Sequence, residues 1–148
     1  IVFKSANDSI TIAPIICYES VFGAYVTEYV QNGAGLLGII TNDAWWGNTA
    51  GHQQHWSFAR IRAVETRRSV ARSANTGWSG FINQRGDEIE RSEYLKPAVL
   101  RAKLKMNTEL TFYVKYGDVL GIWCLVLALI ILLNLLVVKL KNSSVKTV

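Results

Sequence analysis

The sequence predicts an α/β domain followed by one C-terminal transmembrane helix. Two short apolar runs rich in β-branched residues, separated by a segment with helical spacing, are typical of a strand, a helix and a second strand. Near the C-terminus, twenty consecutive positions carry no charge, which is the length that a helix needs to cross a bilayer. With 148 residues, the chain is long enough for one domain with a hydrophobic core.

The first two strands are predicted at residues 10–16 and 36–40, where the β-branched apolar runs lie. Between them, residues 21–31 place apolar side chains at helical spacing, and the Asn-Gly-Ala-Gly turn at 32–35 ends that helix. Strands connected through a helix pair in parallel. We therefore expect a parallel pair at this point of the sheet.

A second helix is predicted at residues 52–68, after a turn-rich loop at 41–51 that contains two tryptophans. The helical period assigns the inward face of this helix to four apolar side chains. These are Trp56, Ala59, Ala63 and Val64.

Three more strands are predicted after this helix. Residues 69–74 and 78–82 have strand composition, and residues 84–87 form a hairpin turn in which Gly86 can adopt a positive φ. Residues 98–104 alternate between apolar and polar side chains, which is typical of a half-exposed strand. These strands are expected to extend one edge of the sheet.

The uncharged stretch is predicted to span a membrane. At about 1.5 Å per residue it forms a helix of roughly 30 Å, and its C-terminal place excludes a signal peptide. The lysines that follow it predict a cytoplasmic tail, with the globular part on the opposite side. The expected divisions are a globular part at 1–112, a juxtamembrane segment at 113–118, the transmembrane helix at 119–138 and a basic cytoplasmic tail at 139–148.

The net charge of +5 comes partly from a cluster of arginines. A solvated helix face is the simplest interpretation of this cluster, and anionic lipid headgroups are a better partner for it than nucleic acid, because an outward-facing domain does not meet nucleic acid. No nucleic-acid partner is therefore expected. The arginines are Arg60, Arg62, Arg67, Arg68 and Arg72.

The two cysteines, Cys17 and Cys124, lie in the globular part and in the apolar stretch, so no disulfide is expected between them. His52 and His55 are three residues apart without a supporting cluster of ligands, so no metal site and no cofactor are expected.

Cys17 is the candidate for chemistry. It follows the first buried strand directly, and α/β sheets place their sites at the carboxyl ends of such strands. The thiolate form of a cysteine is a nucleophile, and backbone N–H groups in the turn after it can stabilise an oxyanion. From these residues alone two roles stay open: a buried structural thiol, which is the commoner one, and a nucleophile.

Motifs in a fixed order extend this picture. The segments ICYES, IITNDAWWG and ARIRAVETRRSVARSANTG, then YGD before the apolar stretch, resemble the C-terminal half of the carbon–nitrogen hydrolase (nitrilase) superfamily. Within it, the chain resembles the apolipoprotein N-acyltransferase family over about residues 5–138. The resemblance implies a four-layer αββα sandwich, of which this chain would be the C-terminal part. The absence of a start methionine gave the same expectation.

The resemblance also implies roles for individual residues. Cys17 would be the nucleophile, Tyr18 would donate its backbone N–H to an oxyanion, and Glu19 would support the pocket. Trp45 and Trp46 would lie near the pocket, either contacting lipid or only packing the loop.

The implied reaction moves a fatty acyl chain from a phospholipid, through a thioester on Cys17, to the N-terminal diacylglyceryl-cysteine of a lipoprotein. The partners would be the phospholipid donor, the diacylated lipoprotein and the membrane. The place would be the bacterial cytoplasmic (inner) membrane, with the catalytic domain on its extracytoplasmic face.

The family's catalytic glutamate and lysine belong to segments before the cysteine, and the residues before Cys17 do not match them. Lys4 lies outside any matching context, and Glu65 is interpreted as a structural carboxylate. The chain is therefore expected to be inactive by itself. Two alternatives remain: a membrane-anchored hydrolase of amides or nitriles, and a non-catalytic scaffold tethered to the membrane.

Overall fold

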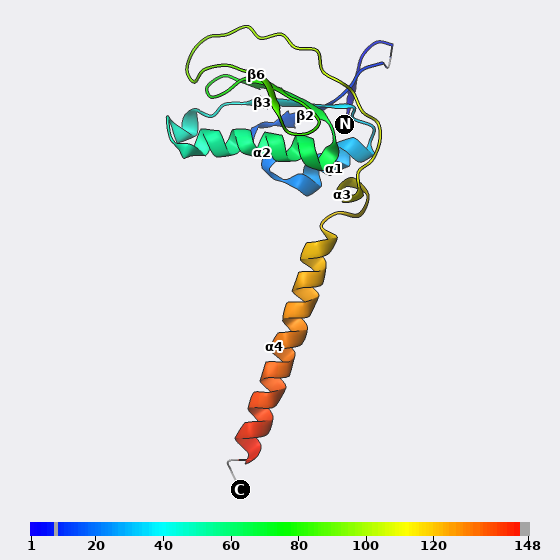
Figure 1. Cartoon of the computed structure of the whole chain (residues 1–148), viewed down its shortest axis with the longest axis vertical. Helices are drawn as coiled ribbons and strands as arrows, with labels where there is room; N and C mark the ends of the chain where they lie inside the picture. The colour runs from blue at the N-terminus through cyan, green and yellow to red at the C-terminus, as the bar shows by residue number, and fades with distance from the viewer. Residues whose placement is uncertain (8, 146–148) are drawn as a thin grey trace. The chain divides into compact units, whose positions relative to one another are not determined.

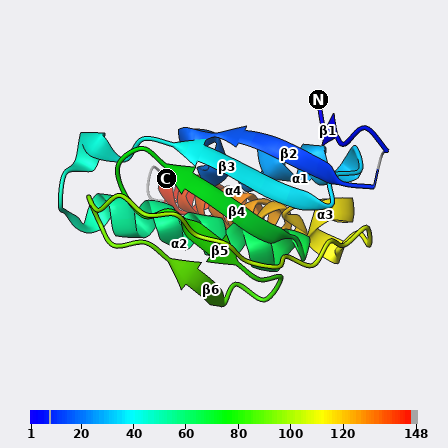
Figure 2. The same cartoon turned by 90° about the horizontal axis from the view of Figure 1, so that it is seen from above.

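The computed structural model describes residues 1–7 and 9–145, and the chain divides into two units, one at Ile1–Lys115 and one from Tyr116 onward. The first unit contains a six-stranded mixed sheet in the order β1-β2-β3-β4-β5-β6 (Figures 1 and 2). The strands are Phe3–Lys4 (β1), Thr11–Ile16 (β2), Leu36–Thr41 (β3), Ser69–Ala74 (β4), Gly80–Ile82 (β5) and Glu88–Arg91 (β6).

The centre of the sheet is parallel: β2 pairs with β3, and β3 pairs with β4. The outer pairs are antiparallel. Helices fill both parallel connections, which confirms the predicted strand–helix–strand arrangement. They are the 3-10 helix Cys17–Val21 (η1) and Gly23–Gln31 (α1) after β2, and the 3-10 helix Ala44–Trp46 (η2) and Ala50–Thr66 (α2) after β3.

The core lies between the sheet and the two helices α1 and α2, which cover the same face of the sheet (Figure 1). Alternate residues of the strands point into it, as the two-residue period requires. The inward positions of α2 are correctly predicted except for Val64, which is 41% exposed, because its side chain points to the Gly86 turn rather than to the sheet. The buried apolar residues include Ala13, Ile15, Leu37, Ile39, Trp56, Ala59, Ala63, Val70 and Ile82.

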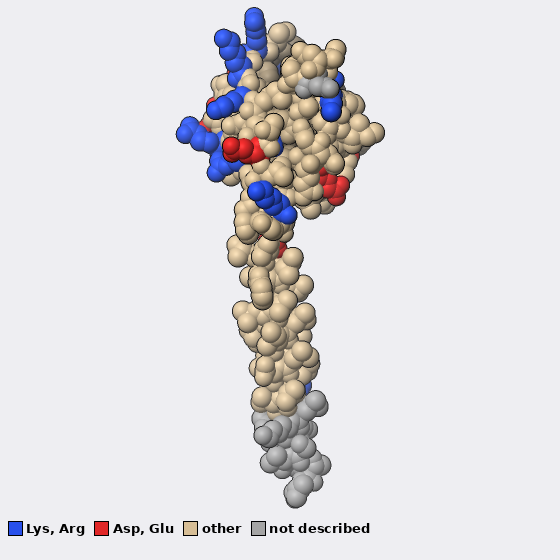
Figure 3. All heavy atoms as spheres, turned by 90° about the vertical axis from the view of Figure 1, so that its right-hand side faces the viewer, with Lys and Arg blue, Asp and Glu red and all other residues tan. Residues whose placement is uncertain are grey.

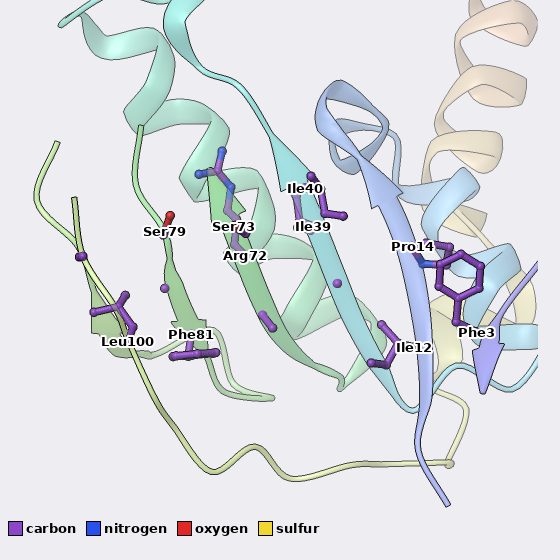
Figure 4. Close-up of a pocket in the computed structure, with 14 residues that line it drawn as sticks. Phe3, Ile12, Pro14, Ile39, Ile40, Arg72, Ser73, Ser79, Phe81 and Leu100 are labelled. Atoms are coloured by element: carbon purple, nitrogen blue, oxygen red, sulfur yellow. The ribbon is translucent and has the colours of Figure 1, made fainter. Parts of the chain in front are cut away.

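The opposite face of the sheet is apolar and only partly covered. A hollow of about 350 Å³ lies on it, lined by residues such as Ile12, Pro14 and Phe81, and Leu100 borders it from the segment after β6 (Figure 4). The side chain of Ile40 on this face is 60% exposed.

The strand predicted at residues 98–104 is wrong, because this segment pairs with no strand. Its alternation is real, since Leu100, Ala102 and Leu104 are half-buried while the residues between them are exposed. The chain continues past the ends of β3 and β4, where Ser69 Oγ donates to Lys105 O over 2.8 Å, into the helix Phe112–Tyr116 (α3).

The predicted solvated arginine face is also wrong for three of its five members. Arg62, Arg68 and Arg72 are buried, and their guanidinium groups donate to carbonyl oxygens or pair with carboxylates. Arg68 Nε, for example, donates to Ala34 O over 2.7 Å. Arg60 and Arg67 remain exposed. A charged side chain can be buried where its donors are satisfied, and residue composition alone does not reveal those partners.

The second unit contains the helix Val119–Val145 (α4). At its start, Asp118 Oδ1 accepts a hydrogen bond of 2.9 Å from Gly121 N, a favourable contact at a helix N-terminus. In the described part of the chain, Val119–Lys139 is the one helix long and apolar enough to cross a membrane; its mean hydropathy is 2.9 and none of it is buried. Its surface is almost free of charge (Figure 3). Lys146 of the predicted tail lies outside the described residues.

Candidate active site

Cys17 stands where β2 ends and η1 begins, at the carboxyl edge of the parallel strands. Its side chain is half-buried, and its backbone has a φ of +50°, in the left-handed region. That conformation costs a non-glycine residue about 1–2 kcal/mol, so surrounding contacts have to hold it. Strained residues of this kind are found at functional sites more often than elsewhere.

The Cys17 sulfur contacts the neighbouring strand. In the parallel register, Ile16 pairs with Ile40, so Cys17 follows β2 just where Thr41 ends β3. Thr41 Oγ1 lies 3.2 Å from Cys17 Sγ, within hydrogen-bond distance for sulfur. No role was expected of Thr41 from the sequence, although it ends the strand next to the cysteine and carboxyl ends of parallel strands share one edge.

Two side chains lie at the Cys17 carbonyl oxygen. Ser20 Oγ donates to it over 2.9 Å, and His55 Nε2 lies 3.2 Å away. Ser20 Oγ and His55 Nε2 are themselves 3.0 Å apart, and both side chains are buried. These contacts fix the carbonyl of a residue whose backbone is strained.

Asp43 contacts three of the side chains near Cys17: Thr41, His55 and Arg72. It is fully buried, and its Oδ1 lies 2.9 Å from His55 Nδ1 and 3.0 Å from Thr41 Oγ1. Its Oδ2 forms an ion pair of 2.8 Å with Arg72 Nη2. Burial alone would raise the pKa of Asp43, but the hydrogen bonds from His55 and Arg72 outweigh it and hold the pKa below its ordinary value.

Both ring nitrogens of His55 have close polar neighbours. Asp43 Oδ1 lies 2.9 Å and Arg72 Nη2 lies 3.0 Å from His55 Nδ1. Ser20 Oγ lies 3.0 Å and the Cys17 carbonyl oxygen lies 3.2 Å from His55 Nε2. From the sequence, His55 was a candidate only for metal binding. Among the described residues, no group of three or more His, Cys, Asp or Glu side chains is arranged to hold a metal ion.

Tyr18 and Glu19 lie in the same turn as Cys17. The Tyr18 ring is 51% exposed and packs edge-on against Phe22, with ring centroids 5.8 Å apart. Glu19 Oε2 accepts a hydrogen bond of 2.7 Å from Ile16 N, so the carboxylate ties the turn to the strand before it. Tyr25 OH donates to the other oxygen of Glu19 over 3.3 Å.

The two tryptophans of the loop differ. Trp46 packs against His55 and Tyr18, with ring centroids 5.1 Å and 6.4 Å away. Trp45 is 84% exposed. Trp46 therefore helps to form the wall of the site, whereas Trp45 projects away from the domain.

Glu65 lies on α2 and pairs with buried Arg62 at 2.9 Å, a contact that fits the structural role expected of it. Cys17 and Cys124 are both free thiols and belong to different units.

Comparison with known proteins identifies the family. The model of the carbon–nitrogen hydrolase family matches residues 3–113. An apolipoprotein N-acyltransferase of Chlorobaculum tepidum is 37% identical over 119 residues, which are 80% of this chain and 22% of that protein. One of Agrobacterium fabrum is 44% identical over 94 residues, 64% of this chain and 18% of that protein. The chain thus spans about a fifth of the length of these relatives.

Solved structures show the same fold at low sequence identity. An amidase from Nesterenkonia sp., with acrylamide added at its active-site cysteine, has a TM-score of 0.53 and 18% identity, covering 64% of this chain and 38% of the amidase. A Saccharomyces cerevisiae member of the nitrilase superfamily has a TM-score of 0.54 and 19% identity, covering 64% of this chain and 36% of the yeast protein. The chain belongs to the carbon–nitrogen hydrolase family.

Proposed function

We propose that this chain is the part of an apolipoprotein N-acyltransferase that carries its nucleophile, Cys17. The observation that supports this most is the position of Cys17: a strained residue at the carboxyl edge of a parallel sheet, with a hydroxyl 3.2 Å from its sulfur and two side chains on its carbonyl. A cysteine with only a packing role needs none of these contacts. The relatives named as N-acyltransferases supply the reaction class.

The proposed reaction has two steps. The Cys17 thiolate attacks the ester carbonyl of a phospholipid; a carbon–sulfur bond forms, the carbon–oxygen bond breaks, and the lysophospholipid leaves with a proton. The N-terminal amine of a diacylated lipoprotein then attacks the thioester; a carbon–nitrogen bond forms, the thiolate is restored, and the amine loses a proton to a base. The resemblance assigns that base to a glutamate, aided by a lysine, in segments that precede the matched part.

Three neighbours would assist. The backbone N–H of Tyr18 would donate to the oxyanion of each tetrahedral intermediate. Glu19 would keep the turn in place through its bond to Ile16 N. Trp46 at the wall of the site and exposed Trp45 would contact acyl chains, for which large apolar rings are suited.

A membrane location fits this substrate. A phospholipid donor stays in the bilayer, so the enzyme has to work at its surface, and Val119–Lys139 is long and apolar enough to anchor it there. We place the protein in the bacterial inner membrane. The lysines after the span favour a cytoplasmic tail, with the catalytic domain on the extracytoplasmic face.

A hydrolase is the second candidate, because the fold is shared with an amidase that has an active-site cysteine. It would use the same thioester or acyl-enzyme and release it to water. The two candidate functions differ in the acceptor of the acyl group, which is a lipoprotein amine for the acyltransferase and water for the hydrolase.

The test supplies the full-length protein in detergent with a phospholipid and a diacylated lipopeptide, and follows the products by mass spectrometry. The proposal predicts an N-acylated lipopeptide with Cys17 and none with Cys17→Ala. Free fatty acid with unmodified lipopeptide would favour the hydrolase. No Cys17-dependent product would favour the scaffold.

A further inference from the structure

We propose that Thr41 is a catalytic residue, whose hydroxyl donates a hydrogen bond to Cys17 Sγ when the thiol has lost its proton, and that Asp43 and His55 position it. The inference rests on the proposed function, because it requires Cys17 to react as a thiolate. Thr41 lies in the IITNDAWWG segment, but no role was expected of it from the sequence; the contact between neighbouring strands supplies one.

The hydroxyl of Thr41 has one hydrogen and two acceptors within reach. Cys17 Sγ lies 3.2 Å from Thr41 Oγ1, and Asp43 Oδ1 lies 3.0 Å from it. While Cys17 is a thiol, its S–H can donate to Thr41 Oγ1, and the threonine hydrogen can point to Asp43. Both contacts are then satisfied.

Loss of the thiol proton reverses this arrangement. The proton leaves for a carboxylate base, and the sulfur keeps the electron pair. A thiolate has no hydrogen to donate, so the Thr41 hydroxyl turns about its C–O bond and donates to the sulfur. No covalent bond changes on Thr41. A hydrogen bond to a charged group is stronger than one between neutral groups, so the turn favours the thiolate.

Asp43 can lose the hydrogen bond from Thr41 with little loss of free energy, because its carboxylate keeps other partners. It keeps the hydrogen bond from His55 Nδ1 and the ion pair with Arg72, at 2.9 Å and 2.8 Å. Arg72 also compensates the negative charge of Asp43, which would otherwise oppose a second negative charge nearby. The Asp43–Arg72 ion pair therefore repels the Cys17 thiolate less than an unpaired carboxylate would.

The same network holds the backbone of the nucleophile. His55 reaches from Asp43 to the Cys17 carbonyl, so one chain of contacts fixes both the sulfur and the carbonyl of this residue. The charged or titratable groups around the site are Tyr18 and Glu19 on η1, Asp43 after β3, His55 on α2 and Arg72 on β4. All five are retained in the variants below.

The test measures alkylation of Cys17 by iodoacetamide in the full-length protein, across a pH series that brackets ordinary thiol titration. Mass spectrometry of the Cys17 peptide gives the rate at each pH and separates it from other cysteines. The variants are Thr41→Val, which removes the hydroxyl, and Thr41→Ser, which keeps it. Thr66→Val is the matched control, because Thr66 is also buried and its hydroxyl donates to Arg62 O, one turn earlier at the C-terminal end of α2.

We expect Thr41→Val to react about tenfold more slowly at neutral pH, with its profile moved upward by about one pH unit, the size of one charge-assisted hydrogen bond. At high pH its rate should reach the plateau of the unmodified protein, which a merely distorted site would not do. Thr41→Ser and Thr66→Val should keep the original profile.

An unchanged profile for folded Thr41→Val would overturn the inference while leaving the proposed function intact. If Thr41→Val does not fold, Thr41→Ala, which also lacks the hydroxyl but adds no bulk, gives the same comparison. If Cys17 of the unmodified protein reacts no faster than an ordinary cysteine at neutral pH, both the inference and the proposed function fail.

Discussion

At the scale of single residues, the site depends on what holds Cys17 in its left-handed conformation. The local cost of about 1–2 kcal/mol is opposed by the hydrogen bond from Ser20 Oγ to the Cys17 carbonyl, and one such bond contributes about 0.5–1.5 kcal/mol, which is of the right size to offset it. Asp43 contacts Thr41 and His55, which both contact Cys17. A small shift of the Asp43 carboxylate should therefore change the position of Cys17.

Gly77 provides a way to move Asp43 without mutating it. Its φ is +113°, and a Cβ there would lie within 3 Å of the Asp43 side chain, so Gly77→Ala should displace the carboxylate. Gly33→Ala is the matched control, because Gly33 also has a positive φ, +93°, but a Cβ there meets nothing within 4 Å. We expect both variants to lose about 1 kcal/mol through backbone strain, and only Gly77→Ala to lose acyl transfer.

The two effects are measured as the thermal unfolding midpoint and the rate of lipopeptide acylation. Equal acylation rates in the two variants would contradict the assigned role of Asp43.

Asp43 should also make the protein sensitive to acid. A carboxyl whose pKa is lowered on folding adds stability above its unfolded pKa of about 3.9, and this stability is lost as the pH falls through the folded pKa. Asp43→Asn should be less stable by about 3 kcal/mol at neutral pH, because Arg72 loses its buried partner. It should also lose less stability than the unmodified protein on acidification below about pH 4.

Chemical unfolding at a series of pH values checks this, with stability taken from each curve. Glu65, whose pKa is raised by burial, titrates with the opposite sign but contributes equally to both proteins. Parallel pH curves for the two proteins would show that the Asp43 pair is not the source of the acid sensitivity.

At the scale of elements, sequence patterns predicted what periodicity and turn chemistry encode. The parallel unit of β2, α1 and β3, and the strand β4, were correct because apolar runs and glycine turns mark them directly. The segment at 98–104 failed because alternation shows which side chains face the protein, not whether the backbone has a partner strand. The short strands β1 and β6 were missed for lack of an apolar pattern.

The candidate site residues expected from the sequence lie in two short segments. Cys17, Tyr18 and Glu19 stand together after the first strand, and Trp45 and Trp46 lie in the loop after the second. Thr41, His55 and Arg72 come from three other elements, and only the strand order and register bring them to the cysteine. Such long-range contacts leave no periodic signal in a single sequence.

The helix α4 can be tested as a membrane span. A charged residue at the centre of a span costs about 2.5–3.5 kcal/mol, whereas one near its end can reach the interface. Leu129→Arg should therefore hinder insertion, and Leu120→Arg should hinder it much less. A reporter fused after the last residue gives the side of the membrane that the tail occupies. We expect a cytoplasmic tail that is partly lost only in Leu129→Arg; the same result for both variants would contradict the assigned span.

At the scale of the molecule, one face of the sheet is apolar and only partly covered. Side chains such as Ile12, Ile40 and Phe81 form this face, and the four-layer sandwich implied by the resemblance would cover it with a second sheet. Burying one such side chain fully contributes about 1.5–3 kcal/mol. We therefore expect a second sheet to cover this face in the full-length protein.

Lysine substitutions test this cover in the full-length protein. Ile40 is 60% exposed in this structure and Val64, on the helix-covered side, is 41% exposed. We expect Ile40→Lys to lower the thermal midpoint clearly, because a buried unpaired charge is costly, and Val64→Lys to change it little. If Ile40→Lys is as well tolerated as Val64→Lys, nothing packs on this face.

The central claim is that Cys17 forms an acyl thioester. The most direct measurement incubates the full-length protein with phospholipid and no acceptor, then examines the Cys17 peptide by mass spectrometry with and without hydroxylamine. We predict a fatty-acyl mass on Cys17 that hydroxylamine removes, because thioesters are cleaved by this nucleophile. A Cys17 that stays unmodified under these conditions would contradict it.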